Sequence, residues 1–380
     1  MAYVTPLTLD LKIKKNKEKQ SDSSLTPSGC YQIVSLCSIM PLCLMCCAYL
    51  QRAYNSQGLQ KFTIEQIGEI LLDIDSYYPS TAFVQDLYAR MLIMRIVDEY
   101  ICALHRQGQI GFVASCRGHE AAQVGSAVCI EVGKDFTLPY DRDLGVVLTI
   151  GMTPYEIFRT YIQTYRKQMQ AGRMVYPAQE FQAAHQWGYQ KHNMVAGAAP
   201  VATQILHAAG IAFASKLRKA SAVTVAYCGD DAIAEPDFLE GITFSAHHTL
   251  PAIYIYERDT SYSRKYTESD ASPLQTISLP MNIDYHCIDG SDVLAVNTAM
   301  HAAMRHTHEG LGPVLLEIQV CRHGENEPAS PLQSTQFDPL LRCQRYLEEH
   351  GIWDEDWATQ LRERIIKEVE QAVQDALRDG

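Results

Sequence analysis

The spacing of apolar residues changes along the chain, and the change falls near residue 220. Before it, apolar residues recur at helical spacing in the stretches 82–108, 118–133, 153–169 and from Pro200 onward. Thr153 and Pro154 suit the N-cap and first position of the third helix. Residues 135–151 are strand-like with a polar turn, and 171–198 are typical of a long functional loop.

Beyond residue 220, strands and helices alternate. The runs AVTVAYC, PAIYIYE, YHCID and PVLLEIQVC are continuously apolar or nearly so, as in strands buried on both faces. The helical segments PDFLEGITFSAHH and SDVLAVNTAMHAAMRHTHEG lie among them, and an amphipathic charged helix follows from Trp353. This order predicts an α/β fold: a doubly wound parallel sheet with helices on both faces, plus a C-terminal amphipathic helix.

The first sixty residues read differently. A basic stretch precedes an uncharged apolar segment at 33–50, which Pro41 interrupts. This segment is open to three interpretations: a signal anchor or signal peptide, a stretch outside the domain that arises from an upstream start codon, or a buried partner helix. We favour the second, because the rest of the chain is typical of an intracellular enzyme. The sequence thus predicts an N-terminal extension over 1–60 and one folded domain over 61–380.

Composition narrows the function classes. The chain is 47% hydrophobic and 20% charged, which is typical of a globular protein. A net charge of -12 argues against a nucleic-acid partner, because phosphate binding needs a basic face. The 12 cysteines form no paired CxxC motif, so we expect reduced core thiols in a cytoplasmic protein and neither a zinc site nor a membrane protein.

Two acidic residues follow successive predicted strands. Asp230 comes after the run that ends at Cys228, and Asp259 comes after the next run. Adjacent parallel strands would place both at one edge of the sheet, where their oxygens suit Mg²⁺ or Ca²⁺. The alternative is that Asp230 and Asp231 merely cap the following helix, and spacing alone favours that interpretation.

A family resemblance shifts this balance. From about Lys61 onward the chain resembles the alpha subunit of the thiamine diphosphate-dependent dehydrogenase of 2-oxo acid dehydrogenase complexes, the branched-chain (2-oxoisovalerate) type above all. The matching stretches are LYARMLIMRIVDEYICALHRQGQIGF, GHEAAQVG (G-Q-E-A-A-Q-V in the family), LPYDRDLGVVLTIGM, PVATQILHAAG, IDGSDVLAV, EGLGPVLLEIQVCR and FDPLLRCQRYLEEHGIWDEDW. The resemblance implies the fold of that family and common ancestry, which is not yet proof of activity.

The resemblance also implies a cofactor site. The family's G-D-G and N-N motifs correspond to Gly229-Asp230-Asp231 and Arg258-Asp259. It implies Mg²⁺ ligands at Asp230, Asp259 and the Ser261 carbonyl. The residues implied to contact thiamine diphosphate are Phe112, Arg142, Pro200, Gly229, Asp230, Asp231, Ala232 and Arg258.

The chain departs from the family at several of these positions. Asp231 replaces a glycine, Asp141 a tyrosine and Ala199 a serine. Asp259 replaces an asparagine and adds a charge beside the diphosphate, at a cost of about 4 kcal/mol for a pair some 4 Å apart. Only Arg258, Arg264 or Lys265 turning inward would offset it. Asn326 occupies the position of the family's histidine and cannot act as a general acid, so the catalytic residue is left unassigned.

Three functional hypotheses therefore stand side by side. In the first, the chain pairs with a beta subunit, decarboxylates a branched-chain 2-oxo acid and passes the acyl group to the lipoyl arm of the acyltransferase core. In the second, it is a catalytically silent paralogue that keeps the fold and serves assembly or regulation. The third, more remote, is a thiamine enzyme of altered chemistry. The substitutions around the implied cofactor favour the second hypothesis, while the retained Arg142 and Asp230 oppose complete loss of binding.

Overall fold

The structure is a computed structural model, and it describes residues 79–111, 113–170, 187–196, 200–261, 283–322 and 337–379, with single positions at 274, 276, 278 and 281. All of them belong to one compact unit that begins at Pro79. The predicted extension over 1–60, with its apolar segment at 33–50, lies outside the described residues and stays a prediction. Among the described helices, none combines the length and the apolar character that a membrane crossing requires.

The centre of the unit is a five-stranded parallel sheet in the described part of the chain. Its strands are β1 (Phe136–Leu138), β2 (Thr224–Cys228), β3 (Ala252–Asp259), β4 (Asp284–Asp289) and β5 (Val314–Val320). Their order across the sheet is β1-β2-β3-β5-β4, and every neighbouring pair is parallel. The predicted α/β fold with a parallel sheet is confirmed.

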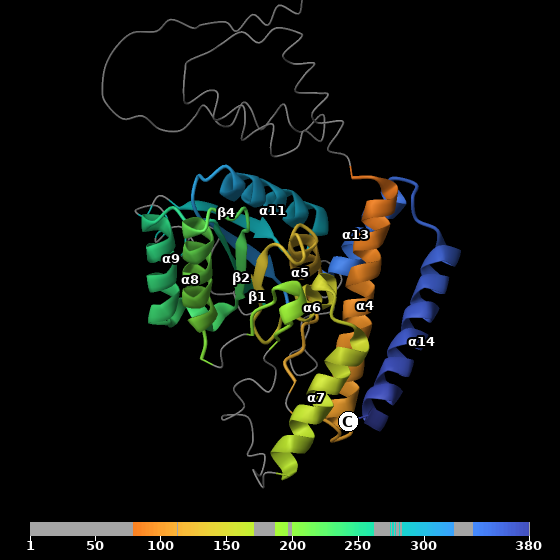
Figure 1. Ribbon diagram of the computed structural model, residues 1–380. Coiled ribbons are helices and arrows are strands. Elements are labelled where there is room, and N and C mark those ends of the chain that lie inside the picture. Colours follow the sequence, from red (N-terminus) through yellow and green to blue (C-terminus); the bar gives the residue numbers. More distant parts are fainter. Residues whose placement is uncertain are drawn as a thin grey trace, which may run out of the picture. The chain divides into compact units, whose positions relative to one another are not determined.

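Helices cover both faces of this sheet (Figure 1). One face packs against α8 (Thr203–Leu217) and α9 (Pro236–His247), and the other against α5 (Glu120–Ala127), α6 (Leu144–Ile150) and α11 (Val293–His308). Side chains along β3 alternate between the two faces of the sheet. Ile253 and Ile255 pack on the side of α5, α6 and α11, whereas Tyr254 and Tyr256 pack on the side of α8 and α9.

An outer layer of helices packs on α5 and α6. It consists of α4 (Thr81–Arg106), α7 (Pro154–Gln170), α13 (Pro339–Glu349) and α14 (Glu355–Asp379), of which α4, α7 and the terminal helix were expected. The Tyr88 ring of α4 meets the rings of Trp353 and Trp357 at centroid distances of 5.2 and 5.8 Å. Such aromatic pairs add about 0.5–1.5 kcal/mol each beyond the area they bury.

Side-chain caps fix where these helices begin. Thr153 Oγ1 accepts from the Glu156 N–H at 3.3 Å, while the Glu156 carboxylate accepts from the Thr153 N–H at 2.8 Å. This reciprocal pair is a capping box, so the predicted cap at Thr153 and helix start at Pro154 are confirmed.

Three element boundaries differ from the sequence-based expectation. Leu144–Ile150 is the helix α6 and not part of a strand, because a short apolar run does not distinguish a strand from a buried helical turn. Residue Ala202 has φ 69°, in the left-handed region, so α8 begins at Thr203 and not at Pro200. Strand β3 runs two residues further, to Asp259, because β5 continues to pair with it through Val320.

Candidate active site at the carboxyl edge of the sheet

The carboxyl ends of β2 and β3 bring Asp230 and Asp259 together. Both oxygens of the Asp230 carboxylate accept from the backbone N–H of Asp259, each at 3.2 Å. The Tyr256 hydroxyl donates a further hydrogen bond to Asp230 Oδ1 at 3.1 Å. Asp230 therefore binds the neighbouring strand and does not cap α9, which begins only at Pro236, so the capping alternative is wrong for this residue.

The surroundings of Asp230 shift the pKa of its carboxyl group. Burial raises the pKa of the Asp230 carboxyl, and the nearby Asp259 charge raises it further. The hydrogen bonds from the Asp259 N–H and the Tyr256 hydroxyl work in the opposite direction, because they favour the ionised form. The same burial raises the pKa of the Tyr256 hydroxyl, so this side chain stays a donor at neutral pH.

Both carboxylate oxygens of Asp259 already have partners in the protein. Oδ1 accepts from the Ser261 N–H at 2.9 Å and from the Ser261 hydroxyl, and Oδ2 forms an ion pair with Nε of Arg322. The Arg322 N–H in turn donates to Ser261 Oγ at 2.8 Å. Burial alone would raise the pKa of Asp259, but the donors of Ser261 and Arg322 lower it overall.

Arg258 lies on the other face of the sheet. It has the same strand parity as Tyr254 and Tyr256, whereas Asp259 faces the α5 and α6 side. The Arg258 Nη1 donates to Glu317 Oε1 at 2.9 Å. Of the three side chains expected to offset the charge of Asp259, Arg258 thus faces away, and Arg264 and Lys265 lie outside the described residues. Arg322, after the end of β5, pairs with Asp259 instead.

Arg142 and Gly229 line the same edge from neighbouring segments. Arg142 follows β1, and its Nη1 donates to the Ser115 carbonyl at 2.8 Å. Burial lowers the pKa of Arg142, but nearby acidic groups, Asp259 among them, raise it overall. Gly229 lies against the Tyr140 ring, so that a Cβ at Gly229 would approach Tyr140 Cε2 to 3.1 Å. The glycine therefore permits this close approach of backbone and ring.

Of the remaining predicted site residues, the structure describes Asp231, Ala232 and Pro200. Asp230–Ala234 form the 3₁₀ helix η2, in which Asp231 is exposed and Ala232 is buried. Pro200 is exposed. Phe112, Ala199 and Asn326 lie outside the described residues.

A buried polar network lies directly beneath this edge, and sequence analysis missed it. Oε2 of Glu257 accepts from the Tyr140 hydroxyl at 2.9 Å and from Gln123 Nε2 at 3.1 Å, and lies 2.6 Å from His119 Nδ1. Gln123 Nε2 also donates to the Arg142 carbonyl at 2.9 Å, which links the network to the edge. The available signal was the acidic residue at the end of PAIYIYE, a run expected to be buried on both faces.

The same network holds unsatisfied polar atoms. Glu257 Oε1, His119 Nε2 and Asp143 Oδ1 are buried without a hydrogen-bond partner. Burial and the charge of Glu257 raise the pKa of Asp143 well above its usual range. A carboxyl group in this position holds a proton more firmly than one in water.

The groups at the edge suit a diphosphate better than a divalent ion. The guanidinium groups of Arg142 and Arg322 are the positive charges that a phosphate at this edge would meet. A divalent ion at Asp259 would compete with the donors of Ser261 and Arg322, which already engage both carboxylate oxygens. Nowhere in the described residues do three or more His, Cys, Asp or Glu side chains form a group able to hold a metal.

Comparisons with known proteins bear on the same part of the chain. The family model described as "Dehydrogenase E1 component" matches residues 88–380. The chain is 31% identical over 303 residues to the 2-oxoisovalerate dehydrogenase subunit alpha of Bacillus subtilis (strain 168), covering 77% of this chain and 89% of that protein. It is 30% identical over 309 residues to the pyruvate dehydrogenase E1 component subunit alpha of Staphylococcus aureus (strain COL), covering 77% of each.

Proposed function

Because the chain belongs to the dehydrogenase E1 component family, we propose that it is the alpha subunit of a thiamine diphosphate-dependent 2-oxo acid dehydrogenase. The supporting observation is the edge where Asp230, Gly229 and Arg142 converge beside Arg322. Ligands of parallel sheets bind at this edge, beyond the carboxyl ends of the strands. The reaction proposed is oxidative decarboxylation of a 2-oxo acid with transfer of the acyl group to a lipoyl arm.

In this proposal the protein positions the cofactor and the cofactor provides the electron sink. Bound thiamine diphosphate would supply this sink for the electron pair released as carbon dioxide leaves a 2-oxo acid. Arg142 and Arg322 would neutralise phosphate oxygens, and Gly229 lets the Tyr140 ring pack against the backbone at the end of β2. Asp230 is held by two donors and orders the loop after β2. Asn326, at the position where the family has histidine, is proposed to orient a carbonyl and not to donate a proton.

A branched-chain 2-oxo acid is the substrate we propose, following the resemblance to 2-oxoisovalerate dehydrogenase. The relatives include both 2-oxoisovalerate and pyruvate dehydrogenase subunits at similar identity. A comparison of kcat/KM for 2-oxoisovalerate and pyruvate, with the reconstituted alpha and beta subunits, separates the two. A preference for pyruvate would overturn the substrate assignment and leave the reaction class intact.

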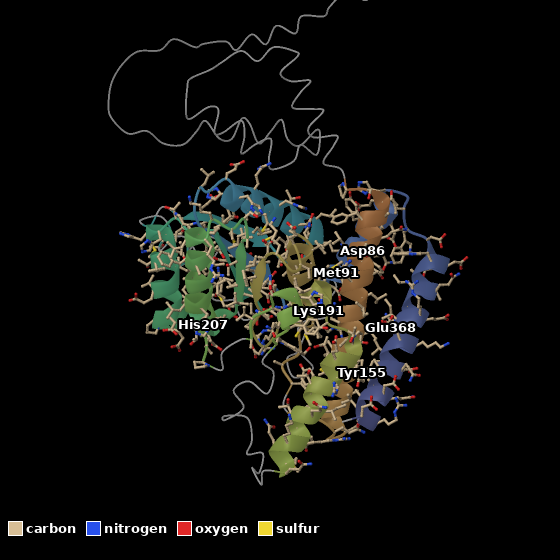
Figure 2. All side chains as sticks on the ribbon, in the orientation of Figure 1. Asp86, Met91, Tyr155, Lys191, His207 and Glu368 are labelled. Carbon is tan, nitrogen blue, oxygen red and sulfur yellow. The ribbon has the colours of Figure 1, made fainter. Side chains whose placement is uncertain are left out.

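The proposed partners are a beta subunit and the lipoyl acyltransferase core. Support for the first comes from α8, where Leu206, Gly210, Phe213 and Leu217 recur at spacings of four, three and four residues. Leu206 and Leu217 are exposed, as are Leu239 and Phe244 on neighbouring α9. His207, also exposed, marks this side of the unit, opposite the side marked by Glu368 (Figure 2). An exposed apolar face of this kind is typical of a subunit interface.

The proposal also concerns the cellular compartment and the metal. We place the protein in the cytoplasm, in keeping with Cys116, Cys228 and Cys343, which are buried as free thiols. The Mg²⁺ expected from the sequence is opposed by the geometry of Asp259, whose oxygens are already bonded.

Thermal unfolding of the alpha–beta complex with and without thiamine diphosphate tests the proposal. Ligand at a hundredfold excess over its dissociation constant should stabilise the complex by about 2.7 kcal/mol. A melting temperature that does not move at saturating cofactor would contradict it.

The ion pair of Asp259 and Arg322 also favours a second candidate function, the catalytically silent paralogue. If the pair closes the edge to any ligand, the chain would assemble with its beta subunit yet bind no cofactor. Robust decarboxylation of a 2-oxo acid by the reconstituted subunits would dispose of this alternative. Normal assembly without a thermal response to thiamine diphosphate would instead favour it.

A further inference from the structure

We propose that the Arg322 guanidinium takes the place of the divalent cation at this edge, so that the chain binds a diphosphate ester without a divalent ion. The inference rests on the proposed function, since thiamine diphosphate is the diphosphate ester concerned. It concerns how this chain holds the cofactor, and it departs from the metal ligands that the family resemblance implies.

The first observation is that both carboxylate oxygens of Asp259 are engaged by donors of the protein. Its two oxygens accept from Ser261 and Arg322, and its side chain is only 3% exposed. The side chain of Arg322 is 27% exposed, so it is the member of the pair that a ligand can reach. The accessible charge at this position is therefore positive, although the residue that replaces the family's asparagine is an acid.

The second observation is that Arg322 is fixed at both ends. Its backbone N–H donates to Ser261 Oγ at 2.8 Å, while its Nε binds Asp259. The residues thus join the end of β5 to the end of β3, its direct neighbour in the sheet. A guanidinium whose backbone and Nε are both bonded keeps its orientation, which reduces the entropy lost when a phosphate binds.

The third argument is that a divalent ion at Asp259 would compete with this ion pair. An ion that used Asp259 would have to displace Arg322 and would then lie beside a displaced positive charge. Mg²⁺ demands an octahedron of oxygens and gives up its water reluctantly, so Asp230 alone is a poor site. Arginine, in contrast, matches phosphate oxygens through its planar donors and needs no deprotonated ligand.

The alternation of side chains along β3 explains why the neighbouring Arg258 cannot take this role. Arg258 lies on the opposite face of β3, where its guanidinium binds Glu317. Arg142 is available at the edge, but its Nη1 is bonded to the Ser115 carbonyl. Arg142 adds a second positive charge at this edge, beside that of Arg322.

The experiment measures the affinity of the alpha–beta complex for thiamine diphosphate by titration calorimetry, once in EDTA and once in excess MgCl₂. The expected dissociation constants differ by less than about threefold. Arg322→Gln should weaken binding in EDTA by about tenfold or more, and Asp259→Asn, which frees the guanidinium and restores the family residue, should make Mg²⁺ tighten binding by about tenfold. Arg90→Gln removes an equal charge from the exposed face of α4 and should change neither value.

The outcomes separate this inference from the proposed function. Binding that Mg²⁺ tightens more than about tenfold in the parent complex overturns the role of Arg322 and leaves the enzyme proposal standing. An unaltered affinity of Arg322→Gln in EDTA overturns it as well. Absence of binding in both buffers overturns both. Circular dichroism and co-elution with the beta subunit verify that each variant is folded, and Arg322→Lys, which keeps the charge but loses the planar fork, should bind between Arg322→Gln and the parent.

Discussion

Glu257 is fully enclosed, yet side chains from two separate segments converge on one of its oxygens. Tyr140 and Gln123 donate to it, and His119 lies within hydrogen-bonding distance. Burial of a carboxylate is costly unless donors surround it, because it loses the hydration it had in water. The network therefore positions the loop that carries Arg142 relative to β3.

Loss of one donor to Glu257 should lower the free energy of unfolding by a measurable amount. Tyr140→Phe keeps the ring against Gly229 but removes the hydroxyl from Glu257, and should lower the free energy of unfolding by about 1 to 3 kcal/mol. Urea-induced unfolding measures this. Tyr189→Phe is the matched control, because its hydroxyl donates to Glu156 at 3.0 Å near the surface, and its loss should be smaller. Equal losses for the two variants would contradict a special role for the buried hydroxyl.

At the scale of single elements, a buried ion triad ties three helices together. Arg95 of α4 pairs with Glu120 of α5, and with Asp338 at 3.1 Å. Asp338 is also the N-cap of α13, where it accepts from the Leu340 N–H at 2.9 Å. One carboxylate thus both starts a helix and fixes it to its neighbours.

This double role predicts a pH dependence. Burial would raise the pKa of Asp338, but the charge of Arg95 lowers it overall, below the ordinary value of 3.8. A depressed pKa means that the stabilisation is complete above the ordinary value and is lost as the pH falls through the lowered one. Asp338→Asn keeps a cap acceptor but not the charge, and should cost about 2 to 4 kcal/mol at neutral pH.

Unfolding of parent and Asp338→Asn as a function of pH measures the difference, which should shrink in acid. Asp292→Asn is the matched control: Asp292 caps α11, but its partner Arg342 is more exposed, so the loss should be smaller. A constant difference between parent and Asp338→Asn across the pH range would rule out the ion pair as its cause.

Elements also show what the sequence could and could not predict. The run AVTVAYC became β2 because all five strand residues are buried, the environment that its composition indicates. LGVVLTI has the same character but is helical, and only the tertiary contacts decide: a Cβ on Gly145 would overlap the Met94 sulfur, so α6 fits closely against α4. Local pattern carries no information about such contacts.

The candidate site shows the same limit. The shared edge of Asp230 and Asp259 follows from strand adjacency, and was expected. That Arg258 faces away could have been predicted had β3 been extended by two residues, because side chains alternate. The pairing of Asp259 with Arg322 could not, since it joins residues 63 positions apart through the order of strands in the sheet.

At the scale of the whole molecule, the exposed faces of α8 and α9 dominate one side. Phe213 and Phe244 meet with their ring centroids 5.5 Å apart, so apolar side chains of the two helices are in contact on this surface. The proposed beta subunit would cover it. The opposite side is closed by α14, whose Leu361, Ile365 and Val369 are buried against the unit's own core.

A charge on the exposed surface should prevent assembly and leave the chain folded. Leu217→Glu, at a position 68% exposed, should weaken binding of the beta subunit by about tenfold or more, measured by calorimetric titration or size-exclusion chromatography. Met169→Glu, at a position 55% exposed on α7 in the outer layer, is the control and should assemble as the parent does. Unimpaired assembly of Leu217→Glu would mean that the partner docks elsewhere.

The register of β3 against β5 has a consequence for evolution. Neighbouring positions of β3 bear opposite charges on opposite sides, Arg258 toward α8 and α9 and Asp259 toward α5. Deletion or insertion of one residue upstream in that strand would exchange them, with every apolar neighbour, between the two layers. Because such a shift would also move the apolar side chains out of their layers, the charge at the candidate site is altered with less damage to the fold by substituting a residue in place.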